Sequence, residues 1–264
     1  MNTATLSQKT PRAIFLDIDG TILPDGREIP TARVLDALRR AQNAGHFVFI
    51  NTGRALGNLP EKLLHCFPFD GYVTGCGNYI LWKDTLLFRN RMSPALCTLV
   101  AEHILSQEKK IWCAFEGETG LLQINSPWLT DSSELTKATD LPAVFADFPV
   151  TKIDLGYGKN DPFPDFGEYR DQVTLFCMET YTEVCPLGCS KATGIDRVLA
   201  EIGLPLENSI AIGDSPNDLQ MLEHAGLGIA MGNASPEVKE KADLIAPSCD
   251  EDGVATILEQ LLGI

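Results

Sequence analysis

Two aspartates separated by one residue, Asp17 and Asp19, follow the short apolar run of residues 13–16. An extended backbone places side chains two residues apart on the same face, so both carboxylates can point in one direction. Two negative charges held together are unfavourable without a counter-ion, so a divalent cation or a shared proton is expected beside them. Asp214 follows another apolar run and can supply a further oxygen ligand. Hard oxygen donors with no His or Cys nearby favour magnesium, Mg²⁺.

Three other polar segments could join this pair. They are Asn51-Thr52-Gly53-Arg54, the helix start at Lys191, and Gly213-Asp214-Ser215-Pro216-Asn217-Asp218. The aspartate pair and these segments each have an ordinary structural explanation when taken alone. An Asp-x-Asp pair can arise by chance, Lys191 can be solvated, and the segment 213–218 can cap a helix. All of them in this order, each at a strand end or a helix start, are far less frequent by chance and favour one shared site.

The elements that position these segments alternate between apolar runs and amphipathic stretches. The expected strands cover residues 13–16, 47–50, 72–74, 209–212, 228–231 and 244–246. The first expected helices run from Thr31 to Gly45, over about 55–65 and over 191–202. The next helix follows the segment 213–218 and ends at about Ala225, another begins after Ser235, and the last lies around 252–262. This alternation predicts an α/β fold, a Rossmann-like doubly wound parallel sheet whose ligands bind at the carboxyl ends of the strands.

The middle of the chain interrupts this alternation. Residues 111–115, 121–124, 150–155 and 173–178 are typical of strands, with fewer helices and many Pro and Gly between them. We therefore expect an inserted α+β domain at 82–187, flanked by the two parts of the core at 1–81 and 188–264. Within the insert, the candidates for lining a site are Trp112, Glu116, Glu118 and Trp128, each of which could equally lie on the surface or in the core of the insert.

Composition narrows the classes of partner. The chain of 264 residues carries 21 Lys and Arg against 36 Asp and Glu, a net charge of −15, which argues against nucleic acid as a partner. No apolar run is long enough to cross a membrane, and the eight cysteines show no C-x-x-C spacing, so we expect reduced thiols in a cytoplasmic protein. An acidic chain can still bind a small phosphorylated metabolite where a metal or a few cations gather.

Four motifs in order resemble those of the haloacid dehalogenase (HAD) superfamily of phosphotransferases. They are D-I-D-G-T at 17–21, N-T-G-R at 51–54, S-K-A-T-G-I at 190–195 and G-D-S-P-N-D at 213–218. An insert of about 100 residues between the second and third motifs is similar to the C2 cap of the Cof-type phosphatases of subclass IIB. The resemblance implies a Mg²⁺-dependent phosphatase acting on a small phosphorylated metabolite, with a sugar phosphate as the expected substrate.

The resemblance also implies roles for the acidic residues. Asp17 would be the nucleophile that forms an aspartyl-phosphate, and Asp19 would protonate the leaving alcohol and then deprotonate the attacking water. For that role Asp19 should bind protons readily, as when a carboxylate lies beside it. Mg²⁺ would be held by Asp17, Asp214 and the backbone carbonyl of Asp19. Asp218 would orient Lys191 or a metal-bound water.

The remaining motif residues would contact the phosphoryl group. Thr52 offers a hydroxyl, Gly53 a backbone amide and Lys191 a positive charge, which together act by electrostatic preorganisation. Asn217 would contact the phosphate or the water. Arg54 is a weaker candidate, for the substrate or for structural pairing.

One position departs from the pattern, and two other functions remain open. Cys76 stands where many relatives have Asn, within Thr74-Gly75-Cys76-Gly77-Asn78, and neither Cys76 nor Asn78 is assigned to the site. A phosphomutase or phosphotransferase would also pass through a phosphorylated Asp17. A non-catalytic phospho-sensor uses a similar acidic cluster, although Asp19 and the large insert argue against it.

Overall fold

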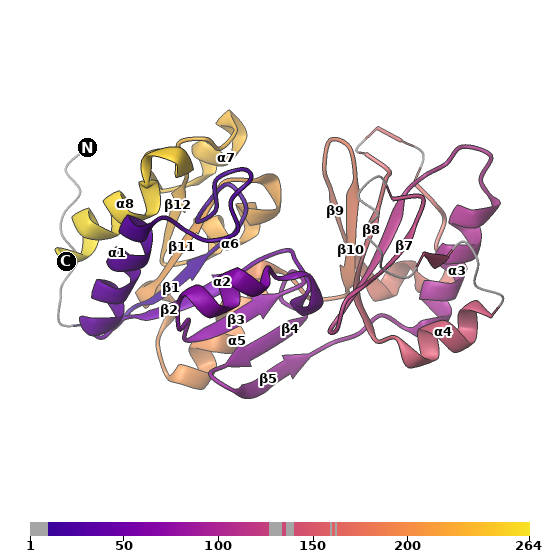
Figure 1. Cartoon of the computed structure of the whole chain (residues 1–264), viewed down its shortest axis with the longest axis horizontal. Helices are drawn as coiled ribbons and strands as arrows, with labels where there is room; N and C mark the ends of the chain where they lie inside the picture. The colour runs from indigo at the N-terminus through magenta and orange to yellow at the C-terminus, as the bar shows by residue number, and fades with distance from the viewer. Residues whose placement is uncertain (1–9, 127–133, 136–139, 159, 162) are drawn as a thin grey trace.

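The computed structural model describes residues 10–126, 134–135, 140–158, 160–161 and 163–264. In this part of the chain there are two β-sheets with their helices, a larger unit that contains both termini of the described chain and a smaller unit beside it (Figure 1). The expected α/β fold with an inserted α+β unit is confirmed. We refer to the larger unit as the core and to the smaller one as the cap.

The core is organised around an eight-stranded sheet. Its strands in spatial order are β13 (Leu244–Ile245), β12 (Leu227–Ala230), β11 (Ser209–Gly213), β1 (Ala13–Leu16), β2 (Phe47–Asn51), β3 (Gly71–Thr74), β4 (Tyr79–Trp82) and β5 (Thr85–Arg89). Neighbours from β13 to β3 are parallel, and β4 and β5 extend the edge in antiparallel fashion. The six expected strands of the core agree with the structure to within one residue at either end. β4 and β5 were not expected.

Both faces of this sheet are covered by helices, so successive residues of its strands alternate between two apolar clusters. In β1, Ile14 and Leu16 pack under α1 and α8, whereas Ala13 and Phe15 pack under α5, α6 and α7. The core helices are α1 (Ala32–Asn43), α2 (Glu61–Cys66), α5 (Lys191–Ile202), α6 (Leu219–His224), α7 (Pro236–Lys241) and α8 (Gly253–Leu262), with short 3₁₀ turns η1 (Leu56–Asn58), η4 (Leu206–Asn208), η5 (Pro216–Asp218) and η6 (Cys249–Glu251). Burial on both faces explains why the central strands are almost wholly apolar.

Local signals account for most helix limits. Thr31 caps α1 by accepting a hydrogen bond from the Val34 amide, and Gly45 follows the helix with a positive φ of 92°. The single helix expected over 55–65 is wrong. Pro60 lacks the amide hydrogen that a continuous helix needs, and the segment divides into η1 and α2 on either side of it.

The cap is a five-stranded antiparallel sheet with helices on one face. Its strands in spatial order are β7 (Leu121–Ile124), β6 (Cys113–Gly117), β8 (Val150–Leu155), β10 (Thr182–Pro186) and β9 (Val173–Cys177). Helices α3 (Pro94–Ser106) and α4 (Leu141–Asp147) and the 3₁₀ turn η3 (Gly167–Gln172) complete it. The helices α3 and α4 lie on the side away from the core (Figure 1). Phe115, Ile153 and Val184 pack in the cluster beneath them, which leaves the other face of the sheet toward the core.

The strand order of the two sheets indicates where the chain passes from the core to the cap. β5 ends at Arg89 and still belongs to the core sheet, beyond the expected limit at residue 81. We therefore propose that the cap begins after Arg89, and the division at 82–187 stays a prediction.

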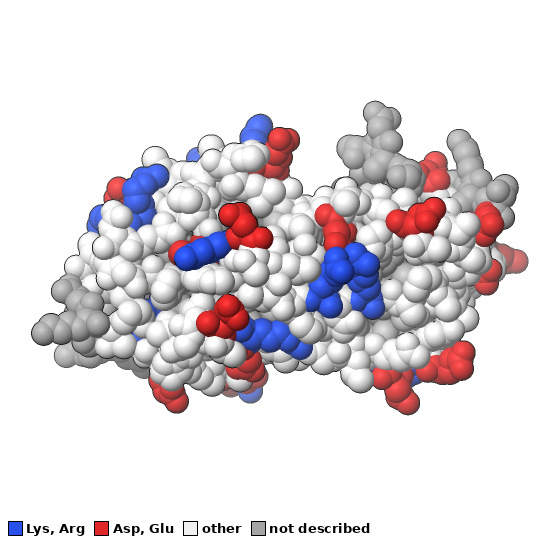
Figure 2. Space-filling model, turned by 90° about the horizontal axis from the view of Figure 1, so that it is seen from below, with Lys and Arg blue, Asp and Glu red and all other residues white. Residues whose placement is uncertain are grey.

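Charge is spread over the surface rather than collected in one sign. On the face shown in Figure 2, several Lys and Arg side chains lie directly beside Asp or Glu. Exposed ion pairs such as Lys241 with Glu223 and Arg91 with Glu118 follow this arrangement. Within the described residues, no helix is both long and apolar enough to cross a membrane. All eight cysteines are free thiols.

Candidate active site

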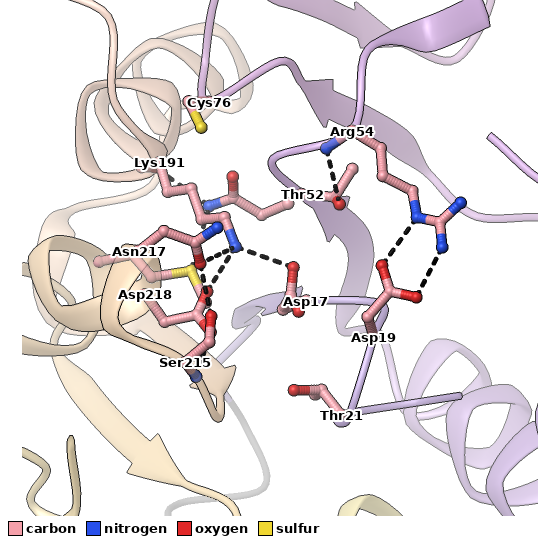
Figure 3. Close-up of polar contacts among 12 residues, drawn as sticks. Asp17, Asp19, Thr21, Thr52, Arg54, Cys76, Lys191, Ser215, Asn217 and Asp218 are labelled. Atoms are coloured by element: carbon pink, nitrogen blue, oxygen red, sulfur yellow. Dashed lines mark hydrogen bonds and ion pairs between the residues drawn. The ribbon is translucent and has the colours of Figure 1, made fainter. Parts of the chain in front are cut away.

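A cavity of about 950 Å³ lies where the core and the cap face each other. Its core side is made by segments that follow β1, β2 and β11, and its cap side by residues of β6, β8 and β10. Parallel strands end at the same edge, so chain positions almost 200 residues apart meet here. Figure 3 shows the side chains of the core side.

Asp17 is the first residue after β1 and is almost fully buried. Its amide donates to the carbonyl of Ile212 in β11, which holds the turn after β1 against the neighbouring strand. Its Oδ1 lies 2.8 Å from the Nζ of Lys191 (Figure 3). Burial raises the pKa of Asp17 to about 8. The charge of Lys191 acts in the opposite direction, and the negative charges of Asp218 and Asp214 act in the same direction as burial.

Lys191 is the central cation of the core side. It opens α5, whose start is fixed by a reciprocal pair of hydrogen bonds between Ser190 and Thr193. Besides Asp17, its Nζ donates to Asp218 Oδ1 at 2.5 Å and to Asn217 Oδ1 at 3.1 Å. Burial lowers the pKa of Lys191, but the carboxylates of Asp17 and Asp218 outweigh this and raise it, so the side chain is a permanent cation. Its burial excludes the alternative that Lys191 is a solvated surface residue.

Asp218 is fully buried, and its side chain holds the backbone of the preceding segment in place. Its Oδ2 accepts from the amides of Asp214 and Ser215 at 3.0 Å each, while its Oδ1 receives Lys191. Both oxygens thus accept hydrogen bonds from protein donors, and one of these donors is Lys191, which Asp218 was predicted to orient.

Three carboxylates of the core side lie close enough to share one cation. Oxygen atoms of Asp17, Asp214 and Asp218 all lie within 4.8 Å of one another. Burial, followed by repulsion from Asp218, raises the pKa of Asp214 to about 6. A set of hard oxygen ligands with this excess of negative charge fits Mg²⁺.

Gly20 has no side chain, and Asp214 occupies the space where a side chain at this position would lie. It adopts a φ of 72°, and a Cβ atom at this position would lie 2.3 Å from Asp214 Oδ2. Two further contacts to Asp214 were missed by the sequence analysis: the Thr21 hydroxyl at 3.3 Å and the Asn233 amide at 3.3 Å. Thr21 belongs to the first motif, and Asn233 follows β12, so position at a strand end was the signal that could have identified both.

Asp19 and Arg54 form a bidentate ion pair at the entrance of the cavity. Arg54 Nε and Nη2 donate to the two carboxylate oxygens of Asp19, each at 2.7 Å (Figure 3). The Asp19 side chain is more than half exposed. A carboxylate partner was expected here, but the ionic partner of Asp19 is the guanidinium of Arg54.

The remaining motif residues of the core lie around the same cavity. Thr52 is buried and accepts from the Arg54 amide at 3.2 Å, and Gly53 and Asn217 line the cavity. A Cβ atom on Gly53 would lie 2.9 Å from Glu183 Oε1 and 3.1 Å from Asn217 Nδ2, so only glycine leaves this space free. The structure therefore brings together every core residue singled out by the sequence.

The cap contributes a set that the sequence indicated only in part. Trp112 and Glu116 line the cavity as candidates, together with residues that were not expected: Lys152, Asp154, Thr180, Tyr181 and Glu183. Glu118 instead pairs with Arg91 at 2.7 Å and does not line it. Trp128 lies outside the described residues. The alternation of polar and apolar residues along the expected strand at 150–155 was the signal that could have found Lys152 and Asp154.

Cys76 lies at the boundary between core and cap. It has a φ of 56°, a backbone region in which Asn is common and other residues are rare, and its thiol donates to Glu183 Oε2 at 3.3 Å. A hydrogen bond with Cys185, followed by burial, raises the pKa of the Cys76 thiol well above its usual range. Asn78 also crosses the boundary, donating to the Thr151 carbonyl at 2.6 Å.

A buried carboxylate, a neighbouring ammonium group and a cluster of carboxylates that could hold a metal form a site suited to phosphoryl transfer. The profile of the haloacid dehalogenase-like hydrolase family matches residues 14–258, and the chain belongs to this family. YkrA of Bacillus subtilis is 30% identical over 95% of this chain and 97% of its own length. YcsE of the same organism, a 5-amino-6-(5-phospho-D-ribitylamino)uracil phosphatase, is 28% identical over 92% and 93%.

Solved structures agree in the fold. The subclass IIB sugar phosphatase BT4131 superimposes with a TM-score of 0.76 at 24% identity, over 94% of this chain and 98% of its own. The chain is an enzyme, a phosphatase of the haloacid dehalogenase family.

Proposed function

We propose that this phosphatase hydrolyses a small phosphorylated metabolite, a sugar phosphate, with Mg²⁺ and through a phosphorylated Asp17. The observation that carries the proposal is the position of Asp17. Its carboxylate is buried at the base of the cavity, 2.8 Å from Lys191 and beside the Asp214 and Asp218 carboxylates. A buried carboxylate held next to a cation and a metal-ligand set is arranged to act as a nucleophile toward a phosphate dianion.

The metal would be held by the side chains of Asp17 and Asp214 and by the backbone carbonyl of Asp19. When bound, Mg²⁺ offsets the negative charge of the carboxylates and of the phosphate, which lowers the barrier to attack by an anion. Asp218 supports this set from behind by fixing the amides of Asp214 and Ser215.

The chain's own residues account for the two steps. A carboxylate oxygen of Asp17 attacks phosphorus, the bond from phosphorus to the leaving oxygen breaks, and Asp19 gives that oxygen a proton. Asp19 then takes a proton from water, which attacks phosphorus and releases Asp17 and inorganic phosphate. Since both Asp19 oxygens are held by Arg54, Asp19 must turn at least one of them toward the substrate to do this.

The phosphoryl oxygens need donors and positive charge in both steps. We assign this to Lys191, the Thr52 hydroxyl, the Gly53 amide and the Asn217 side-chain amide, which surround Asp17 on the core side. Lys191 is held by Asp218 and Asn217, so its charge needs little reorganisation during the reaction.

A polyhydroxylated substrate is supported by the cavity and by one relative. About 950 Å³ accommodates a metabolite of sugar size rather than a macromolecule. YcsE is named for a substrate that carries a phosphorylated ribityl chain, which is a polyol.

The test is phosphate release from a panel of sugar phosphates, nucleotides and p-nitrophenyl phosphate, with Mg²⁺ or EDTA. We expect Mg²⁺-dependent release and a loss of about 10⁴-fold in kcat for Asp17→Asn, since the amide cannot form the phosphoenzyme. Full activity of Asp17→Asn would contradict the nucleophile assignment. An isomeric sugar phosphate formed without free phosphate would identify a mutase, and a phosphoenzyme stable for minutes would identify a sensor.

A further inference from the structure

The cap face of the cavity carries a charged set that the proposed chemistry does not use. Glu116, Lys152, Asp154 and Glu183 come from β6, β8 and β10, and each residue as a whole is more than nine-tenths buried. Glu116 lies opposite Lys152 in the sheet, and Asp154 lies opposite Glu183. Lys152 and Asp154 are two residues apart, so all four point from one face of the sheet. We call these four residues the cap wall.

Lys152 is already neutralised within the cap wall. Its Nζ lies 3.1 Å from Glu183 Oε1, 3.1 Å from Asp154 Oδ1 and 3.9 Å from Glu116 Oε1. Three carboxylates therefore surround one ammonium group, and the wall has an excess of negative charge and of hydrogen-bond acceptors. A buried ammonium with two carboxylates in contact has little capacity left for an anion of the substrate.

Donors from the core satisfy only part of this excess. The Ala55 amide and Asn58 Nδ2 donate to Glu116, at 2.7 and 3.2 Å, and Cys76 donates to Glu183. Asp154 Oδ1 is buried, and it lies 3.1 Å from Lys152 Nζ, the ammonium group that it shares with Glu183 and Glu116. Burial raises the pKa of Asp154 well above its usual range, opposed by Lys152 and reinforced by Glu116. A substrate hydroxyl or amine would add a donor to a wall in which three carboxylates share one ammonium group.

The rest of the cavity has no spare cation either. Among the described residues that line it there are eight carboxylates and two cations, Lys152 and Arg54. Arg54 gives two hydrogen bonds to Asp19, and Lys191 behind the cavity is held by Asp17 and Asp218. A phosphate can rely on Lys191 and Mg²⁺, but a second anionic group near the cap wall would meet three carboxylates and one ammonium group that they already surround.

Trp112 and Tyr181 complete this side of the cavity. Their rings lie 6.2 Å apart with an interplanar angle of 39°, and both line the cavity next to the cap wall. They add apolar surface that can contact the carbon atoms of a polyol or sugar while its polar groups meet the carboxylates.

We propose that the cap wall is the subsite for the leaving group, and that it accepts hydroxyl-rich or amine-bearing leaving groups and rejects those with a second negative charge. The proposal rests on the phosphatase function above and specifies its substrate class. Rejection follows from like charges beside buried carboxylates, and acceptance from donors that meet the excess of acceptor oxygens in the wall.

The test uses pairs of substrates that differ only in one carboxylate. Sorbitol 6-phosphate is compared with 6-phosphogluconate, and glycerol 3-phosphate with 3-phosphoglycerate, in the Mg²⁺-loaded enzyme. We expect kcat/KM to be about 100-fold higher for the uncharged member of each pair. Glucosamine 6-phosphate should match or exceed glucose 6-phosphate. Equal values within the pairs, or a preference for the carboxylates, would overturn the inference.

Two variants locate the selectivity in the cap wall. Glu183→Gln removes a negative charge and Asp154→Asn removes an acceptor oxygen, and each should reduce the ratio within a pair by about tenfold. Glu118→Gln is the matched control, since Glu118 is a cap carboxylate that pairs with Arg91 outside the cavity, and it should leave both the ratio and the activity unchanged. An unaltered ratio in both wall variants, or an altered one in Glu118→Gln, would overturn the inference.

Hydrolysis of p-nitrophenyl phosphate separates the two proposals. This substrate tests Asp17 chemistry without a hydroxyl or a second anion in the leaving group. Release of phosphate from it, without selectivity in the matched pairs, contradicts only the cap-wall inference. Its failure to react, together with the whole panel, contradicts the phosphatase mechanism and the inference that rests on it.

Discussion

Two buried lysines lie at the same cavity, Lys152 in its lining and Lys191 behind it, and the two differ in what accompanies the carboxylates around them. In the core, Lys191 contacts Asp17 and Asp218, and Asp218 also receives two backbone amides. In the cap, Lys152 lies among Asp154, Glu183 and Glu116. The core set follows strand ends, where loops can supply amides, whereas the cap set lies within strands whose amides are already used by the sheet.

The difference indicates that the two lysine sets have different roles. In the proposed function the core set holds Mg²⁺, which offsets its negative charge, and it also supplies donors to the phosphate. The cap set has no such compensation and remains rich in acceptors. Since a phosphate monoester has one anionic and one polar end, the two lysine sets are suited to opposite ends of the same molecule.

The largest effect is expected when the core lysine loses its charge. Lys191→Met should lower kcat by about 10³-fold on every substrate, because the charge on the transferred phosphoryl group loses its fixed counter-ion. Steady-state phosphate release measures this. Lys241→Met is the control, since Lys241 forms an exposed ion pair with Glu223. A loss confined to some substrates would assign Lys191 to substrate selection instead.

A smaller effect is expected at Asp19, and it depends on the leaving group. Asp19→Asn should lower kcat/KM for a sugar phosphate by about 100-fold, because an alkoxide leaves poorly without a proton. For p-nitrophenyl phosphate the loss should be smaller than tenfold, since this leaving group departs without protonation. Equal losses on both substrates would exclude Asp19 as the acid.

Removal of the cap lysine should mainly affect stability and selectivity. Lys152→Met leaves three buried carboxylates without a cation, which we expect to lower the melting temperature by about 10 °C. The same change should leave p-nitrophenyl phosphate as a substrate. Thermal unfolding and turnover below the transition are measured together, with Lys241→Met as the control. An unchanged melting temperature would show that the carboxylates take up protons instead.

The smallest effect is a change of stability with pH. The pKa of Asp17 rises from 3.8 to about 8 on folding, so between these values the folded chain binds more protons than the unfolded chain. Stability of the metal-free protein should therefore fall as the pH rises from 6 to 8, and Mg²⁺ should recover more of it at pH 8 than at pH 6. In Asp17→Asn the slope should be shallower, as measured by melting curves in EDTA. Identical slopes in wild type and variant would contradict the assignment.

The core site was largely predictable because its residues share a simple rule. Asp17, Thr52 and Asp214 each come directly after an apolar strand, and parallel strands bring such positions to one edge. Asn233 follows the same rule and was overlooked, since no other signal accompanied it. The ion pair between Asp19 and Arg54 was not predictable, because it depends on the side-chain directions of two separate loops.

The cap shows where sequence reasoning ends. Lys152 and Asp154 lie two residues apart within a strand that was expected, but their alternation did not reveal which face meets the core. β10, which carries Glu183, was not expected at all. Glu116 accepts hydrogen bonds from Ala55 and Asn58 only because the two units pack together, and no local sequence pattern encodes that contact.

By itself the sequence determined the family, the alternation of strands and helices, and the order of the core motifs, because these depend on local periodicity and on short spacings. Tertiary structure alone decided that a second lysine with three carboxylates faces Asp17 across the cavity. Charges on antiparallel strands of an insert become a single wall only after the sheet has formed and closed over the core, and that arrangement is a property of long-range packing.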